Sequence, residues 1–139
     1  MKDIALILRI MRYVFILPSW LATKSLPEVL RLLTQPQSAI HLPLRRVIVY
    51  SLFWTSLRIP SLRNYCLRRS LILYKFLREA GVDVAINIGV RIDERGRLSG
   101  HSWLTLAGKP YLTRPETASR FKPLFVFPAD NLAGAYPKD

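Results

Sequence analysis

The amino-acid sequence predicts an α+β fold, in which a helical first half is followed by a small antiparallel sheet. Up to about residue 80, apolar side chains recur with the period of a helix, between prolines and polar turns. After Gly81 the period changes, and apolar residues occupy every second position through Ile92. A polar segment that contains Gly96 follows, and a second alternating stretch begins at Gly100. Helices first and strands afterwards are typical of an α+β domain.

Four helices are expected in the first half, over residues 3–17, 25–34, 44–57 and 64–81. Pro18 is expected to end the first, because proline has no N–H to donate within a helix. Ser25, Pro27 and Glu28 form a start signal for the second, with Ser25 as N-cap and Glu28 at the capping-box position. The third contains β-branched residues, which also suit a strand. Gly81 is typical of the position just beyond a helix.

The second half is expected to form strands over residues 82–92, 100–106, 109–113 and, at an edge, 124–127, with a loop or short helix over 115–121. In the second of these strands, His101, Trp103 and Thr105 share one face, because side chains alternate across a strand. The other histidine, His41, lies in a predicted loop between prolines, where a structural or surface role is expected.

Charge is spread unevenly along the 139 residues, whose net charge is +12. Residues 1–80 contain 13 Lys and Arg against 3 Asp and Glu, which is +10, whereas residues 81–139 contain 8 against 6, which is +2. A basic first half indicates an acidic partner, such as a membrane surface, nucleic acid or an acidic peptide. Nucleic acid is not expected, because the sequence contains no recognition motif and no aromatic-basic array.

The first apolar segment is expected to pack in the core or at an interface, and lying on a membrane surface is the second interpretation. Arg9 and Arg12 interrupt it, and the charge-free run over residues 13–23 is shorter than the roughly 18–20 residues that span a bilayer. Arginines within the apolar stretch also argue against a signal peptide. A lone cysteine forms no internal disulfide, so nothing indicates an oxidising compartment and a cytoplasmic location is expected.

That cysteine, Cys66, stands at the start of the fourth predicted helix. Asn64 is a good N-cap and would put Cys66 in the first turn, whereas Ser61 as the cap would move it one turn further in. A helix start favours negative charge, and the thiolate is the nucleophilic form of cysteine. Taken alone, most lone cysteines are small buried hydrophobes. His101, which lies near the start of a later strand, is the candidate for the general base that a cysteine nucleophile needs.

Three segments resemble the signature of lasso-peptide leader peptidases, which are maturation cysteine proteases of the transglutaminase-like superfamily. They are residues 66–81, which begin with Cys66, residues 88–91 (Ile-Gly-Val-Arg) and residues 100–104 (Gly-His-Ser-Trp-Leu). The resemblance covers residues 60–125 and implies a papain-like arrangement, in which the cysteine helix packs on a small antiparallel sheet. It also implies that Cys66 attacks the precursor peptide bond and that His101 is the general base.

The chain departs from this pattern at the residue that orients the histidine. The resemblance places an acidic residue at the end of the short strand after His101, where this chain has Thr113. A threonine hydroxyl accepts a hydrogen bond from imidazole but does not balance the charge of imidazolium. Glu116 is the candidate replacement, while Asp83 or Asp93 would need a less ordinary geometry. A Cys–His dyad, a triad completed by Glu116 and an enzyme of weakened activity all stay open.

The implied function is removal of the leader from a ribosomally made lasso-peptide precursor, with no cofactor and no metal. The implied domains are a helical region over residues 1–60, a peptidase core over 61–128 and a polar tail over 129–139. Residues 1–60 lack the strand pattern of a leader-recognition domain, so the expected partners are the precursor leader, a separate small leader-recognition protein and the lasso cyclase. The alternatives are a non-catalytic scaffold of the same complex, or a basic protein that binds a membrane surface or nucleic acid.

Overall fold

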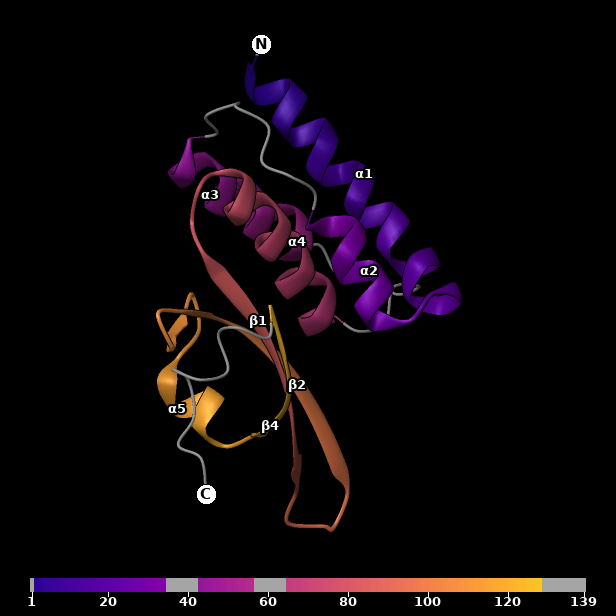
Figure 1. Ribbon diagram of the computed structural model, residues 1–139, viewed down its shortest axis with the longest axis vertical. Helices are drawn as coiled ribbons and strands as arrows, with labels where there is room; N and C mark the ends of the chain where they lie inside the picture. The colour runs from indigo at the N-terminus through magenta and orange to yellow at the C-terminus, as the bar shows by residue number, and fades with distance from the viewer. Residues whose placement is uncertain (1, 35–42, 57–64, 129–139) are drawn as a thin grey trace. The chain divides into compact units, whose positions relative to one another are not determined.

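The computed structural model of the chain describes residues 2–34, 43–56 and 65–128. In these residues, four helices precede a four-stranded antiparallel sheet that carries one further short helix, which confirms the predicted α+β class (Figure 1). The chain forms two compact units, Met1–Val82 and Asp83–Asp139, so the boundary falls between the last long helix and the first strand. The functional division at residues 60 and 128 stays a prediction.

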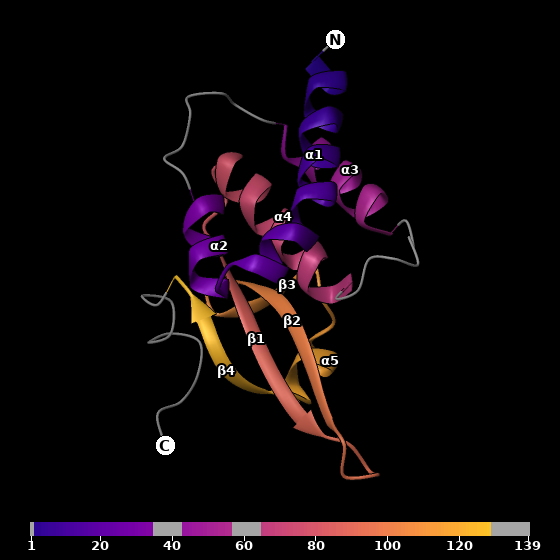
Figure 2. The ribbon, with the colours of Figure 1, turned by 90° about the vertical axis from the view of Figure 1, so that its right-hand side faces the viewer.

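The first unit consists of α1 (Lys2–Thr23), α2 (Leu26–Leu33), α3 (Leu44–Ser56) and α4 (Tyr65–Glu79). The helix α4 contacts each of the other three, as Figures 1 and 2 illustrate. Residues 71–77 of α4 are all buried, so its apolar side chains do not form a single stripe but surround the helix. A helix that is buried on all sides is the core element of its unit.

One charged residue, Lys75, lies within this buried stretch and is only 4% exposed. Its Nζ is 3.0 Å from Glu79 Oε1 and lies over the Tyr13 ring, 4.7 Å from the centroid. Arg9 Nη2 donates to both carboxylate oxygens of Glu79, at 2.9 and 2.8 Å. The arginine that interrupts the apolar first helix therefore belongs to an ion network that makes burial of Lys75 tolerable.

The prediction that Pro18 ends the first helix is wrong, because α1 continues through it to Thr23. Beyond the proline, Trp20 is half-buried and its ring contacts that of Tyr13 on the same helix, with centroids 6.1 Å apart. Proline removes one helical hydrogen bond and strains the turn before it, at a cost of about 3 kcal/mol. The helix nevertheless continues to Thr23.

Two sides of α1 are apolar. Its buried stripe consists of Leu6, Ile10, Val14 and Leu17. On the other side, Ile4, Leu8 and Phe15 are 61%, 59% and 60% exposed. By length and composition alone, residues 3–23 suffice to cross a membrane, a property that core helices and signal sequences share. Only the buried side of α1 therefore packs in the core as predicted.

The helix ends agree with the expected signals in part. Pro27 lies in the first turn of α2, as predicted, but the Ser25 side chain makes no capping hydrogen bond. Beyond α4, Gly81 adopts φ +92° and the N–H of Val82 donates to the carbonyl of Leu77, as expected of a glycine after a helix. The predicted caps Asn64 and Ser61 lie outside the described residues, as does His41.

The second unit is a sheet of order β3-β2-β1-β4, in which every neighbouring pair is antiparallel. Its elements are β1 (Val84–Ile92), β2 (Leu98–Leu106), β3 (Lys109–Tyr111), the short helix α5 (Pro115–Ser119) and β4 (Lys122–Phe127). The edge position predicted for the last strand is confirmed. In the turn between β1 and β2, Asp93 Oδ1 accepts hydrogen bonds from the N–H groups of Arg95 and Arg97, which fixes the hairpin register.

Candidate active site

Cys66 is the second residue of α4, and its side chain is exposed. The interpretation of the lone cysteine as a buried hydrophobe is therefore wrong. Its thiol stands in the first turn of a helix, where the backbone N–H groups favour a negative charge. Arg68, which is 3% exposed, and the half-buried Arg69 follow two and three residues later on the same helix.

His101 lies on β2, directly opposite Gly89 of β1, and is half-buried. Its imidazole stacks on two aromatic rings, on Trp103 with centroids 5.9 Å apart and on Phe121 with centroids 4.9 Å apart. The interplanar angles are 18° and 29°, and the Nε2 atom is buried. Two ring contacts restrict the rotation of the imidazole, so the side chain is held in one orientation.

Trp103 occupies its place because Gly89 has no side chain. A Cβ built at Gly89 would be 2.8 Å from the Cη2 atom of Trp103 and 2.8 Å from the carbonyl oxygen of Lys122. The indole thus lies across β1 at the glycine, and it is 3% exposed. Its stacking on His101 makes the indole a wall beside the histidine.

Two residues beside the histidine were missed by the sequence reasoning. Phe121 follows α5 and stacks on His101, and the Arg91 guanidinium carbon lies 5.5 Å from the centroid of the Phe121 ring. The Nε atom of Arg91 is buried and makes no hydrogen bond within the described part of the chain. Strand alternation from Gly89 would have placed Arg91 on the face of His101, whereas no periodic signal marks Phe121.

Thr113 and Glu116 are the candidates for orienting His101, and within the described residues neither makes a hydrogen bond to it. The predicted extension of the third strand to Thr113 is wrong, because β3 ends at Tyr111 and Leu112 adopts φ +57°, which breaks the extended backbone. Thr113 is half-buried in the bend that follows. Glu116 is exposed in the first turn of α5, and within the described residues its carboxylate makes no hydrogen bond or ion pair. Its orienting role stays a prediction.

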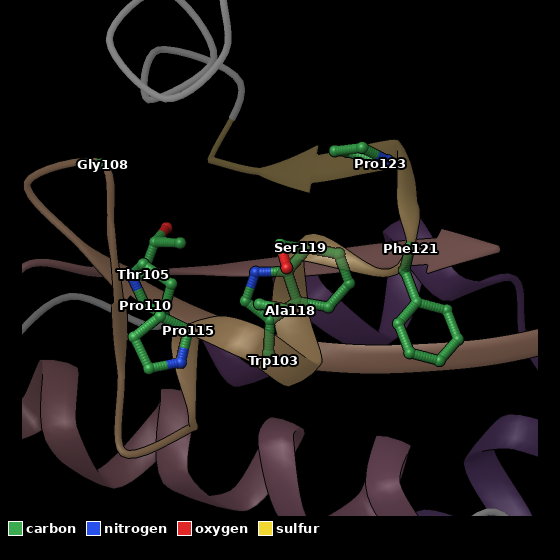
Figure 3. A pocket seen from close by; sticks show the side chains of 9 residues that line it. All are labelled: Trp103, Thr105, Gly108, Pro110, Pro115, Ala118, Ser119, Phe121 and Pro123. Atoms are coloured by element: carbon green, nitrogen blue, oxygen red, sulfur yellow. The ribbon is translucent and has the colours of Figure 1, made fainter. Parts of the chain in front are cut away.

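A cavity of about 430 Å³ opens beside this aromatic group, entirely within the second unit (Figure 3). Its lining comes from β2, the β2–β3 turn, β3, α5 and β4 and consists of Trp103, Thr105, Gly108, Pro110, Pro115, Ala118, Ser119, Phe121 and Pro123. Trp103 and Phe121 are thus both walls of the cavity and stacking partners of His101. Among the described residues, no group of three or more His, Cys, Asp or Glu side chains could hold a metal ion.

The arrangement supplies an exposed thiol at a helix start in one unit and a histidine held by aromatic rings in the other. A thiolate attacks carbonyl carbon, and an imidazole accepts and returns a proton, so these are the residue types that acyl transfer uses. A family model described as the transglutaminase-like superfamily matches residues 9–126, a span that includes both Cys66 and His101. No curated protein and no solved structure matches the chain.

Proposed function

Because this chain belongs to the transglutaminase-like superfamily, which includes cysteine peptidases, we propose that it is a cysteine peptidase that removes the leader from a lasso-peptide precursor. The observation that carries the proposal is the exposed thiol of Cys66 in the first turn of α4. A cysteine kept for packing would be buried, whereas a nucleophile has to reach its substrate. The lasso-peptide subtype is supported by the segments around Cys66 and His101 that resemble the leader-peptidase signature.

In the proposed mechanism, His101 takes the proton of the Cys66 thiol, and the thiolate attacks the carbonyl carbon of the scissile peptide bond. The tetrahedral intermediate collapses when the C–N bond breaks and His101 returns the proton to the leaving amine of the core peptide. The leader then remains as a thioester on Cys66. Water, deprotonated by His101, attacks this thioester, and the leader leaves as a carboxylic acid while the thiol is restored.

One feature of the Cys66 surroundings supports this chemistry. The backbone N–H of Cys66 belongs to the first turn of α4, where amide groups lack helical partners and can donate to the oxyanion. The mechanism requires the sulfur of Cys66 and an imidazole nitrogen of His101 to come within hydrogen-bond distance.

The proposed partners are the precursor leader, a separate leader-recognition protein and the lasso cyclase. Residues 2–34 and 43–56 form helices and contain no strand. These residues therefore offer no strand edge on which the leader could pair. Peripheral membrane association is also a proposal, and it rests on the exposed apolar side chains of α1 and on the charge of +10 over residues 1–80.

The proposal is tested by incubating the protein with a lasso-peptide precursor and its leader-binding protein, followed by mass spectrometry. We expect two products, leader and core, whose masses together equal the precursor plus one water. Because Cys66 is the lone cysteine, iodoacetamide modifies a single thiol, so the alkylated protein is a matched inactive control. Cleavage that survives complete alkylation, or a precursor that stays intact with the untreated protein, contradicts the proposal.

Replacement of Glu116 by glutamine decides between a dyad and a triad. We expect kcat in the same assay to fall less than about tenfold, because an exposed carboxylate is screened by solvent and the imidazole is already held by two rings. Thr113→Val is the companion variant at the position that the resemblance assigns to the acid. A loss on the order of 10⁴ for Glu116→Gln would instead identify Glu116 as the third member of a triad.

A further inference from the structure

The cavity beside His101 has walls that suit an apolar ligand. Trp103 and Phe121 contribute aromatic rings, and Ala118 contributes a methyl group. Three of the remaining lining residues are prolines, which have no N–H to offer, as Figure 3 shows for Pro110, Pro115 and Pro123. Most of the wall is therefore apolar, and covering it with other apolar atoms is favourable.

The two hydroxyl groups of the lining are already engaged within the protein. Thr105 Oγ1 accepts a hydrogen bond from Asn87 Nδ2 at 2.9 Å, and both residues are buried. Ser119 Oγ donates to the carbonyl oxygen of Glu116 at 2.9 Å. The lining contains no charged side chain, so a charged ligand would lose its water without gaining an opposite charge, which is costly.

The position of the cavity connects it with the reacting histidine. Trp103 and Phe121 each present one part of their ring to the cavity and stack on His101 with another. A ligand group in the cavity that contacts either ring is therefore separated from the imidazole by that one side chain.

We propose that this cavity binds a bulky apolar side chain of the peptide substrate and so selects the sequence next to the scissile bond. This inference rests on the proposed peptidase function, because it assigns the ligand as part of that substrate. A volume of about 430 Å³ lies within the roughly 300–1,000 Å³ of small-ligand sites, and it accommodates a large side chain together with adjoining backbone. The cavity does not bind a glycine of the substrate, which has no apolar side chain, or an aspartate, whose side chain is charged.

The test measures binding of four small probes to the full-length Cys66→Ala protein by NMR, read at the indole N–H of Trp103. The probes are the N-acetyl amides of phenylalanine, leucine, glycine and aspartate. We expect the phenylalanine and leucine probes to shift the Trp103 signal in a saturable way, and the other two to leave it unchanged. Equal shifts from the glycine probe would overturn the inference.

Substitution at Ser119 provides the matched comparison. Ser119→Trp fills the cavity mouth from an exposed position on α5, and Ser119→Leu does so with a smaller group. We expect the dissociation constant of the phenylalanine probe to rise about tenfold or more in Ser119→Trp and by a smaller factor in Ser119→Leu. Arg120→Trp adds the same ring at the next, also exposed, residue, which does not line the cavity, and should change the constant less than about twofold.

The outcomes separate this inference from the proposed function. Selective probe binding that Ser119→Trp weakens, in a protein that cleaves no precursor, supports an apolar site and contradicts the peptidase assignment alone. If wild type, Ser119→Trp and Arg120→Trp all cleave the precursor with the same kcat/KM, the cavity does not bind the substrate. That outcome overturns the inference but leaves the peptidase assignment intact. A selective rise of KM in Ser119→Trp, with kcat retained, supports both.

Discussion

Cys66→Ala and His101→Ala should each lower kcat of precursor cleavage by about 10⁴-fold or more. Alanine at position 66 removes the nucleophile, so the thioester cannot form. Alanine at position 101 leaves the thiol in place but removes the group that takes its proton and returns it to the leaving amine. Because both residues act in the same step, the double variant should be scarcely slower than either single variant.

The chain offers a matched control for the histidine substitution. His41 is the other histidine of the sequence, and His41→Ala should retain activity within about twofold of wild type, because the sequence predicts a structural or surface role for it in a loop between prolines. Rates are measured with saturating precursor and leader-binding protein, and circular dichroism verifies the fold of each variant. If His101→Ala keeps the wild-type rate while Cys66→Ala loses it, the base lies elsewhere; if both keep it, the chain is a scaffold.

The order and type of the elements could be predicted because they depend on local periodicity. The change at Gly81 from helical to alternating apolar positions predicted β1, and alternation along β2 placed His101 and Trp103 on one face. The position of Cys66 at the start of a helix was predicted as well, although its exposure was not. Each of these inferences uses only neighbours within one element.

Features that depend on contacts between distant residues were not predictable. Phe121 stacks on His101 across 20 residues of chain, from a turn that carries no period. The strand β3 ends because Leu112 adopts a positive φ, a conformation that a glycine would have indicated but a leucine does not. The helix α1 continues through Pro18, although a proline ordinarily ends a helix. The cavity was not predictable because its walls come from five successive pieces of chain.

Gly89→Ala should lower the free energy of unfolding by about 3 kcal/mol, against the usual direction of a glycine replacement in a strand. Alanine ordinarily stabilises such a position, because it restricts the unfolded chain. At Gly89 the added methyl group would lie 2.8 Å from both the Trp103 ring and the backbone oxygen of Lys122, closer than real Cβ contacts. Either the indole or the β4 strand has to move.

Both movements also reach the histidine, so activity should fall together with stability. A displaced indole loses its stacking on His101 and reshapes the cavity wall, and a displaced β4 shifts the adjoining Phe121. Gly100→Ala is the matched control, because the nearest atom to its added Cβ is the carbonyl oxygen of Gly89 at 3.9 Å. Urea unfolding followed by circular dichroism gives the stability of both variants, and the precursor assay gives kcat. A Gly89→Ala protein as stable and as active as Gly100→Ala would show that the indole does not need the glycine, and that ring stacking does not hold His101 in its working orientation.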